Sequence, residues 1–198
     1  MGIGKQAKTL TNKQIDSVLD HLGRSRAPVR NRAIFLLSVK AGLRAKEIAN
    51  LRWEMVLKGD ASLGDSLALP NIASKGNSGR IIPLNKDLEV ALQELLAEEM
   101  KRKNFNSKDF IVRTQRAERT SPQAVVNMFA TWYRELGMVG CSSHSGRRTL
   151  ITNIARKIST VGGSLRDVQA IAGHSSLAVT QRYIDFDTEA QKKVLNLV

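Results

Sequence analysis

The sequence has little cysteine, no long apolar run and no signal-peptide core, and each of these absences excludes a class of protein. It has a single cysteine, Cys141, in 198 residues, which excludes an internal disulfide and suits a reducing compartment. No run approaches the roughly 20 apolar residues of a membrane span, and the opening MGIGKQAKTL lacks the apolar core of a signal peptide. Because 42% of the residues are hydrophobic, the chain can still bury a core. We expect a soluble, cytoplasmic protein built as one domain.

Acidic residues are also scarce. There are 31 Lys and Arg against 18 Asp and Glu, which gives a formal net charge of +13 and a pI near 10.3. Such an excess favours a polyanionic partner, with nucleic acid as the first candidate and an anionic membrane surface as the second. Residues 1–40 hold eight of the basic residues and residues 101–119 hold seven. Either cluster alone can be a solvated face, but with the overall excess they indicate where phosphates bind.

Hydrophobic spacing and turn residues predict a mainly helical, α+β chain. The pair Thr11 and Gln14 forms a capping-box pattern before the first apolar repeat. Helices are expected over 12–22, 28–42, 43–51, 88–96 and 122–137, and further helices from 141 onward with a break at Gly162-Gly163. Residues 53–84 contain short apolar runs separated by glycines, which predicts a small three-stranded antiparallel sheet. The segment KGNSGR is expected at the tip of its last hairpin.

Three groups of polar residues have two interpretations each. Arg44 follows a helix-ending glycine, where an arginine is usually a solvated cap. His144 and Arg147 lie three residues apart at the start of a predicted helix and so share a face. A helix N-terminus with these side chains is an anion site, or else an exposed polar first turn. His174 and Tyr183 are functional groups or ordinary core residues.

The sequence resembles the catalytic domain of the tyrosine recombinases, the phage integrase family. The resemblance lies in the order of its polar residues: an Arg, a hairpin Lys, His-x-x-Arg, a His and a Tyr. The matching segments are GLRAKEIANLRW, SKGNSGRIIPL, HSGRRTLITNIA and IAGHSSLAVTQRYI. The resemblance implies the tyrosine-recombinase catalytic fold over residues 9–187. A basic extension over 1–8 and a docking tail over 188–198, packed on a neighbouring protomer or on its own domain, complete the expected layout.

The short N-terminal extension departs from the pattern of most family members, in which a separate helical core-binding domain clamps the other face of the DNA. No such domain is expected here. Either the chain is a shortened piece of a protein, or it resembles the short fimbrial phase-variation invertases that lack the domain.

The resemblance implies a site-specific recombinase that cleaves and rejoins DNA through a 3′-phosphotyrosyl intermediate, in integration, excision or inversion. Its roles fall on six residues: Tyr183 is the nucleophile, Arg44 and Arg147 grip the phosphate, Lys75 is the general acid, His144 acts as general base or acid, and His174 donates a hydrogen bond to a non-bridging oxygen. Glu47, one turn after Arg44, is expected to orient the arginines. The candidate DNA contacts are Lys46, Arg80 and Arg148.

The expected partners are double-stranded DNA and further copies of the chain, as a dimer to tetramer on DNA in a prokaryotic cytoplasm. No membrane, small-molecule substrate or cofactor is expected. No metal is expected either, because Cys141 and His144 form one Cys-x-x-His pair without a second pair at zinc spacing. Two other functions remain open. One is DNA relaxation like that of type IB topoisomerases, and the other is a non-catalytic DNA-binding accessory role in which Tyr183 is structural.

Overall fold

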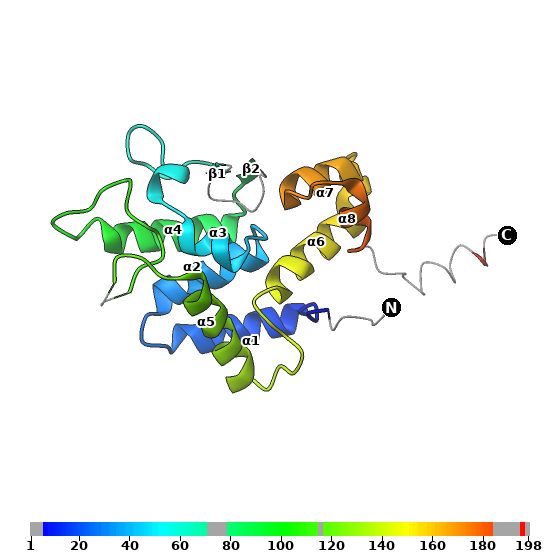
Figure 1. The fold of residues 1–198 in the computed structure, drawn as a ribbon, viewed down its shortest axis with the longest axis horizontal. Helices are drawn as coiled ribbons and strands as arrows, with labels where there is room; N and C mark the ends of the chain where they lie inside the picture. The colour runs from blue at the N-terminus through cyan, green and yellow to red at the C-terminus, as the bar shows by residue number, and fades with distance from the viewer. Residues whose placement is uncertain (1–5, 71–78, 115–116, 184–194, 197–198) are drawn as a thin grey trace. The chain divides into compact units, whose positions relative to one another are not determined.

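The computed structural model describes residues 6–70, 79–114, 117–183 and 195–196. Backbone contacts divide the chain into two compact units, Met1–Leu150 and Ile151–Val198. In Figure 1 the first unit runs from blue to yellow, and the second continues from yellow to orange and red.

The first unit is built on helix α2 (Pro28–Val39). Its segment AIFLLSV, residues 33–39, is apolar on nearly every side and is buried all round, and Ile34, Phe35 and Leu37 are 0% exposed. Helices α1 (Asn12–Gly23) and α4 (Lys86–Glu99) pack on α2, while α3 (Ala45–Asn50) packs on α5 (Pro122–Glu135). These elements confirm the helices predicted in this part of the sequence.

Local signals set the helix starts as expected. The Thr11 side chain accepts a hydrogen bond from the Gln14 N–H, and the Gln14 side chain accepts one from the Thr11 N–H. Pro28 and Pro122 occupy the first turns of α2 and α5, where a missing N–H costs nothing. The capping box and both proline starts are confirmed.

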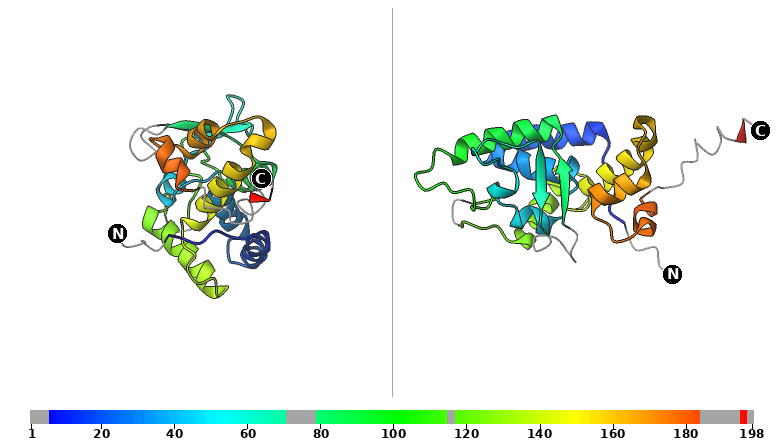
Figure 2. Two further views of the ribbon diagram at one scale, coloured as in Figure 1. Left: turned by 90° about the vertical axis from the view of Figure 1, so that its right-hand side faces the viewer. Right: turned by 90° about the horizontal axis from the view of Figure 1, so that it is seen from above.

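The sheet has two antiparallel strands among the described residues, where three were predicted. Strands β1 (Ser66–Leu69) and β2 (Arg80–Pro83) pair with Leu67 opposite Ile82, and Figure 2 shows them side by side. Before β1, Leu57 and Leu63 form an isolated antiparallel bridge. The turn between these two residues contains Ala61, which adopts a positive φ of 63°. A short 3-10 helix, η1 (Trp53–Met55), comes just before it.

Helix α6 (Ser145–Lys157) begins in the first unit and ends in the second. The second unit continues with a 3-10 helix, η3 (Ile158–Val161), and with helices α7 (Leu165–Ala172) and α8 (Leu177–Gln181). Its small core consists of Ile151, Val168 and Ala172, with the half-buried Tyr183 packed against it. Across the part of the chain that the structure describes, no helix is long and apolar enough to cross a bilayer.

Candidate active site

A buried carboxylate organises the start of α3. Glu47 is 1% exposed, and it accepts hydrogen bonds from the Arg44 backbone N–H at 2.8 Å and from Arg44 Nη1 at 3.0 Å. Arg80, the first residue of β2, donates to the same carboxylate from Nη1 at 3.0 Å and Nη2 at 3.2 Å. The Arg80 side chain is 5% exposed and that of Arg44 is 26% exposed. Glu47 therefore ties the edge of the hairpin to Arg44.

The charge state of Glu47 follows from these contacts. Burial by itself raises the pKa of a carboxyl group, but the hydrogen bonds and charge of Arg80, followed by those of Arg44, bring the pKa of Glu47 below its ordinary value. Glu47 is therefore ionised at neutral pH. Two arginines and one carboxylate leave this cluster with a net positive charge, on the side where Arg44 reaches solvent.

A glycine places the second arginine. The Gly42 carbonyl accepts a hydrogen bond from Arg147 Nη1 at 2.6 Å, and the Arg147 side chain is buried. Gly42 has a φ of +66°, and a Cβ atom there would meet Leu150 Cδ2 at 3.1 Å. Only glycine combines this backbone conformation with such close packing of α6. One turn, residues 42–44, thus supplies the acceptor for Arg147 and carries Arg44 two residues later.

A second glycine seats the segment between His144 and Arg147. A Cβ atom on Gly146 would lie 2.5 Å from Ser38 Oγ on α2, so the first turn of α6 can approach α2 only without a side chain. His144, just before α6, reaches solvent. Partial burial of its ring, then the positive charges of Arg147 and Arg44, lower the pKa of His144 below its usual value near 6.5. His144 is therefore neutral at pH 7 and can accept a proton.

In the second unit, His174 and Tyr183 lie against each other. Their rings stack with centroids 5.0 Å apart and planes at 23°. His174 Nδ1 is 3.0 Å from Oγ1 of the buried Thr180, and the Thr152 hydroxyl donates to the Tyr183 carbonyl at 3.2 Å. The stacked rings therefore position each other, the contact with Thr180 orients the imidazole, and the bond from Thr152 holds the Tyr183 backbone.

The other sequence-predicted residues have different surroundings. Lys75 and most of the tail over 188–198 lie outside the described residues. Lys46 is exposed on α3, and Arg148 is half-buried and donates to the Gln6 side chain. Arg80 was predicted from the sequence to contact DNA, yet its guanidinium faces Glu47 and is almost fully buried. Gly42, Gly146 and Thr180 also shape the site and were not predicted from the sequence, although the glycine inside HSGRR is a signal of close packing.

The structure thus brings two sets of residues together, one in each unit. Arg44, Glu47, His144 and Arg147 belong to the first unit, and His174 and Tyr183 to the second. Within the described ranges no three His, Cys, Asp or Glu side chains are grouped as metal ligands.

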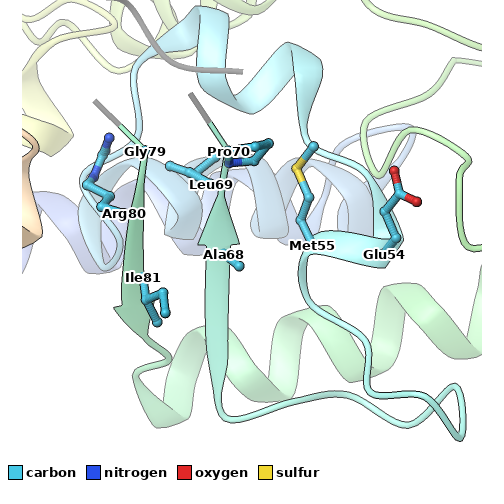
Figure 3. A pocket seen from close by; sticks show the side chains of 8 residues that line it. All are labelled: Glu54, Met55, Ala68, Leu69, Pro70, Gly79, Arg80 and Ile81. Carbon is cyan, nitrogen blue, oxygen red and sulfur yellow. The ribbon is translucent and has the colours of Figure 1, made fainter. Parts of the chain in front are cut away.

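The sheet edge also borders a surface hollow of about 600 Å³. Figure 3 shows Arg80 and Ile81 of β2 at one end of it and Met55 and Glu54 of η1 at the other. Between them its lining is completed by Ala68, Leu69, Pro70 and Gly79. Because the guanidinium of Arg80 is bound to Glu47, this hollow offers few polar groups, and we do not assign the chemistry to it.

Comparison with protein families decides the classification. The model of the phage integrase family matches residues 8–190, which include all six residues of the predicted active site. The chain belongs to the phage integrase family.

Individual members of the phage integrase family are distant in sequence. Tyrosine recombinase XerC of Haemophilus influenzae (strain 86-028NP) is 29% identical over 177 residues, which cover 89% of this chain and 56% of that protein. Tyrosine recombinase XerA of Pyrococcus horikoshii is 28% identical over 193 residues, which cover 95% of this chain and 60% of that protein. The chain therefore spans somewhat more than half the length of these relatives.

Solved structures confirm the fold expected for the family. The crystal structure of XerA recombinase superposes with a TM-score of 0.74 at 20% identity, covering 100% of this chain and 65% of that one. The Tn1549 transposon integrase in complex with transposon right end DNA gives a TM-score of 0.72 at 18% identity, covering 98% of this chain and 67% of that one. At these identities the likeness establishes the tyrosine-recombinase catalytic fold.

Proposed function

We propose that the chain is the catalytic part of a tyrosine site-specific recombinase, which cleaves and rejoins double-stranded DNA through a 3′-phosphotyrosyl intermediate. The observation that carries the proposal is the turn over residues 42–44. This turn carries Arg44, whose guanidinium is held by Glu47, and its Gly42 carbonyl accepts a hydrogen bond from Arg147. Both arginines lie close enough to the neutral His144 to lower its pKa. Two adjacent arginines beside a neutral histidine suit the binding of a phosphate group better than a purely structural ion pair with a carboxylate.

The arginines have a defined task in this scheme. Planar guanidinium groups pair with two phosphoryl oxygens and stabilise the negative charge that builds up on a pentacoordinate phosphorus. Glu47 keeps Arg44 from rotating away, and the Gly42 carbonyl does the same for Arg147. Removing one preorganised donor of this kind typically lowers a rate by about 10²–10³. We expect that loss for Arg44→Gln or Arg147→Gln.

The nucleophile needs help to react at neutral pH. A phenol with a pKa near 10 requires about 4 kcal/mol to ionise at pH 7. In the proposed step the oxygen of Tyr183 forms a bond to the scissile phosphorus as the bond to the 5′-oxygen breaks. The phenol proton passes to a base, for which the neutral His144 is the candidate, and His174 donates a hydrogen bond to a non-bridging oxygen.

The leaving 5′-oxygen needs a proton, and the resemblance assigns this to Lys75. A bridging sulfur leaves without protonation, so a 5′-phosphorothiolate substrate should restore most of the activity that Lys75→Ala loses. If the sulfur substrate restores no activity to Lys75→Ala, Lys75 is not the general acid. Because arginines neutralise the phosphate in this scheme, cleavage should persist in EDTA, and a strict requirement for Mg²⁺ would contradict it.

The decisive experiment traps the covalent intermediate. The protein is incubated with a pool of nicked duplexes with randomised flanks, so that a short fragment diffuses away after cleavage, and adducts that survive SDS are isolated and sequenced. We expect an adduct through Tyr183 and none from Tyr183→Phe. Equal adduct formation by both proteins would refute the nucleophile and favour the accessory DNA-binding role. Sequencing of the trapped DNA also identifies the target site.

A second assay separates recombination from relaxation. A plasmid carrying two copies of the trapped site should yield deleted or inverted products, depending on the orientation of the sites. Relaxation of supercoiled plasmid at an equal rate without any site would favour the topoisomerase-like activity instead.

Recombination needs two duplexes, so we further propose a dimer to tetramer on DNA, formed in a prokaryotic cytoplasm where the protein associates with the nucleoid. The structure of XerH bound to its difH substrate is that of a relative in complex with DNA. Light scattering of the protein with one and two site-containing duplexes measures the assembly. A monomer at every DNA ratio would contradict this part of the proposal.

A further inference from the structure

Two arginines share one aromatic ring beyond the end of α3. The guanidinium carbon of Arg52 lies 4.1 Å from the centre of the Phe110 ring, and that of Arg119 lies 5.4 Å from it. Arg52 follows α3, whereas Phe110 and Arg119 come from the basic segment 101–119. We call these three residues the Phe110 cluster.

The backbone fixes the ring of this cluster. Arg52 and Phe110 form an antiparallel bridge, flanked by hydrogen bonds from the Trp53 N–H to the Asp109 carbonyl at 3.1 Å and from the Ile111 N–H to the Leu51 carbonyl at 2.9 Å. The side chains of Leu51, Trp53 and Ile111 are buried in the core of the first unit. Phe110 is therefore a rigid platform, on which guanidinium groups stack favourably.

Each arginine is also oriented by a neutral acceptor. Arg52 donates from Nη1 to the Lys108 carbonyl, and Arg119 donates from Nη2 to Asn50 Oδ1 at 2.8 Å. The amide of Asn50 is itself held, because its Nδ2 donates to the Lys46 carbonyl at 2.7 Å. These bonds position both guanidinium groups and use only one terminal nitrogen of each.

Within the described residues, the two arginines of the Phe110 cluster differ in their charge balance from two neighbouring arginines. Nearby, Arg102 is paired with Glu99 and Asp109, and Arg113 with Asp109 and Glu118. Among the described residues, neither Arg52 nor Arg119 has a carboxylate within ion-pair distance. In this part of the described chain, carboxylates therefore balance the charges of Arg102 and Arg113 but not those of Arg52 and Arg119.

We propose that Arg52 and Arg119 bind the phosphate backbone of DNA outside the reaction centre, a role that rests on the proposed function. Oriented guanidinium groups that keep their charge and donors match phosphate oxygens. The cluster lies past one end of α3 and Arg44 at the other, and a helix of six residues rises about 9 Å. On a strand that runs along α3, with a rise of about 3.4 Å per nucleotide, the cluster would meet phosphates within a few nucleotides of the scissile one.

The test measures the salt dependence of DNA binding by fluorescence anisotropy, on two unrelated duplexes. Each phosphate contact contributes about 0.9 to the slope of log affinity against log salt. We expect Arg52→Gln and Arg119→Gln each to reduce the slope by about 0.9 on both duplexes. Between 50 and 200 mM salt such a variant then loses about 3.5-fold less affinity than the unaltered protein.

Two further variants sharpen the test. Arg32 is an exposed arginine paired with Glu94 at 3.2 Å, so Arg32→Gln changes the net charge equally but should leave the slope unaltered. Phe110→Leu keeps both charges and removes the platform, so it should weaken binding with the slope retained. An equal slope change from Arg32→Gln, or no change from the Arg52 and Arg119 variants, overturns the proposal. The same anisotropy assay with an acidic peptide such as polyglutamate is a further control. The proposal is also overturned if the Arg52 and Arg119 variants lose affinity for this peptide but not for DNA.

The adduct assay separates this site from the reaction centre. At saturating protein, Arg52→Gln and Arg119→Gln should form the Tyr183 adduct at the unaltered rate constant, because they act on binding alone. A lower rate constant at saturation would make them part of the active site and refute the assignment. If the unaltered protein forms no adduct but the slopes change as expected, the DNA-binding site stands while the proposed recombinase function fails.

Discussion

Replacing Arg80 by methionine tests the buried ion pair next to Arg44. The change keeps most of the side-chain volume but removes the two hydrogen bonds, at 3.0 and 3.2 Å, that Arg80 donates to Glu47. Glu47 keeps its two bonds from Arg44 and stays buried. An ionised carboxylate with half its donors removed is then left inside the protein.

The size of the effect follows from that geometry. Removing one partner of a buried ion pair costs about 3–5 kcal/mol of folding free energy, because the remaining charge is uncompensated. Since two of the four bonds to Glu47 persist, we expect the lower end of that range, about 3 kcal/mol. The matched control is Arg32→Met, which breaks the exposed pair with Glu94 and should cost about 0–1 kcal/mol.

The loss should also depend on pH. The pKa of Glu47 is lowered in the folded protein, so its ionised form contributes stability that is present above the unfolded pKa of about 4.3 and is lost as pH falls through the folded pKa. In Arg80→Met the largest lowering influence is gone while burial remains. The difference in stability between the two proteins should therefore shrink as the pH falls from 7.5 toward 4.

Urea unfolding followed by tryptophan fluorescence measures both effects. The two tryptophans, Trp53 and Trp132, are buried in the first unit, so the signal reports on the unit that contains the pair. A cost for Arg80→Met equal to that of Arg32→Met, or one that does not vary with pH, would refute the reasoning. The double variant Glu47→Leu, Arg80→Met should recover stability, because it removes the buried charge together with its partner.

Three more predictions concern groups around the candidate site. NMR titration of the DNA-free protein should give His144 a pKa below 6.5, as burial and the adjacent arginines require, and an ordinary or raised value would contradict the proposed neutral base. Gly146→Ala should destabilise the protein by about 1–3 kcal/mol through its clash with Ser38 Oγ, and Ser38→Ala should relieve part of that loss in the double variant. Thr180→Val should shift the ¹⁵N resonance of His174 Nδ1 by removing their 3.0 Å hydrogen bond, and should slow adduct formation; an unchanged resonance would show that Thr180 does not set the imidazole.

Much of the fold could be predicted because local signals and periodicity agree. The capping box at Thr11 and the proline starts each specify a helix without help from distant residues, and all were confirmed. The described residues contain two of the three expected strands, and Leu57 and Leu63 form only an isolated bridge beside them. A strand depends on partners that lie far along the chain, so short apolar runs between glycines do not determine how many residues pair.

The candidate site was predictable in residue type but less so in contacts. Six residues of four types, in a fixed order, suggested the chemistry, and the proximity of Glu47 to Arg44 followed from their spacing. That Arg80 faces the same carboxylate could not be read from the sequence, since the two residues are 33 positions apart. The sequence marked Arg80 as a basic residue of a hairpin, which is equally consistent with a DNA contact and with a buried ion pair.

The shared carboxylate also constrains how such a protein can diverge. A lineage that replaces Arg80 alone keeps a buried negative charge, and one that replaces Glu47 alone leaves two guanidinium groups facing each other. Either intermediate is less stable than the starting or the doubly changed protein, so selection should remove it. Descendants of this chain should therefore carry both charges or neither, and the two positions should covary although neither is expected to touch the reacting phosphate.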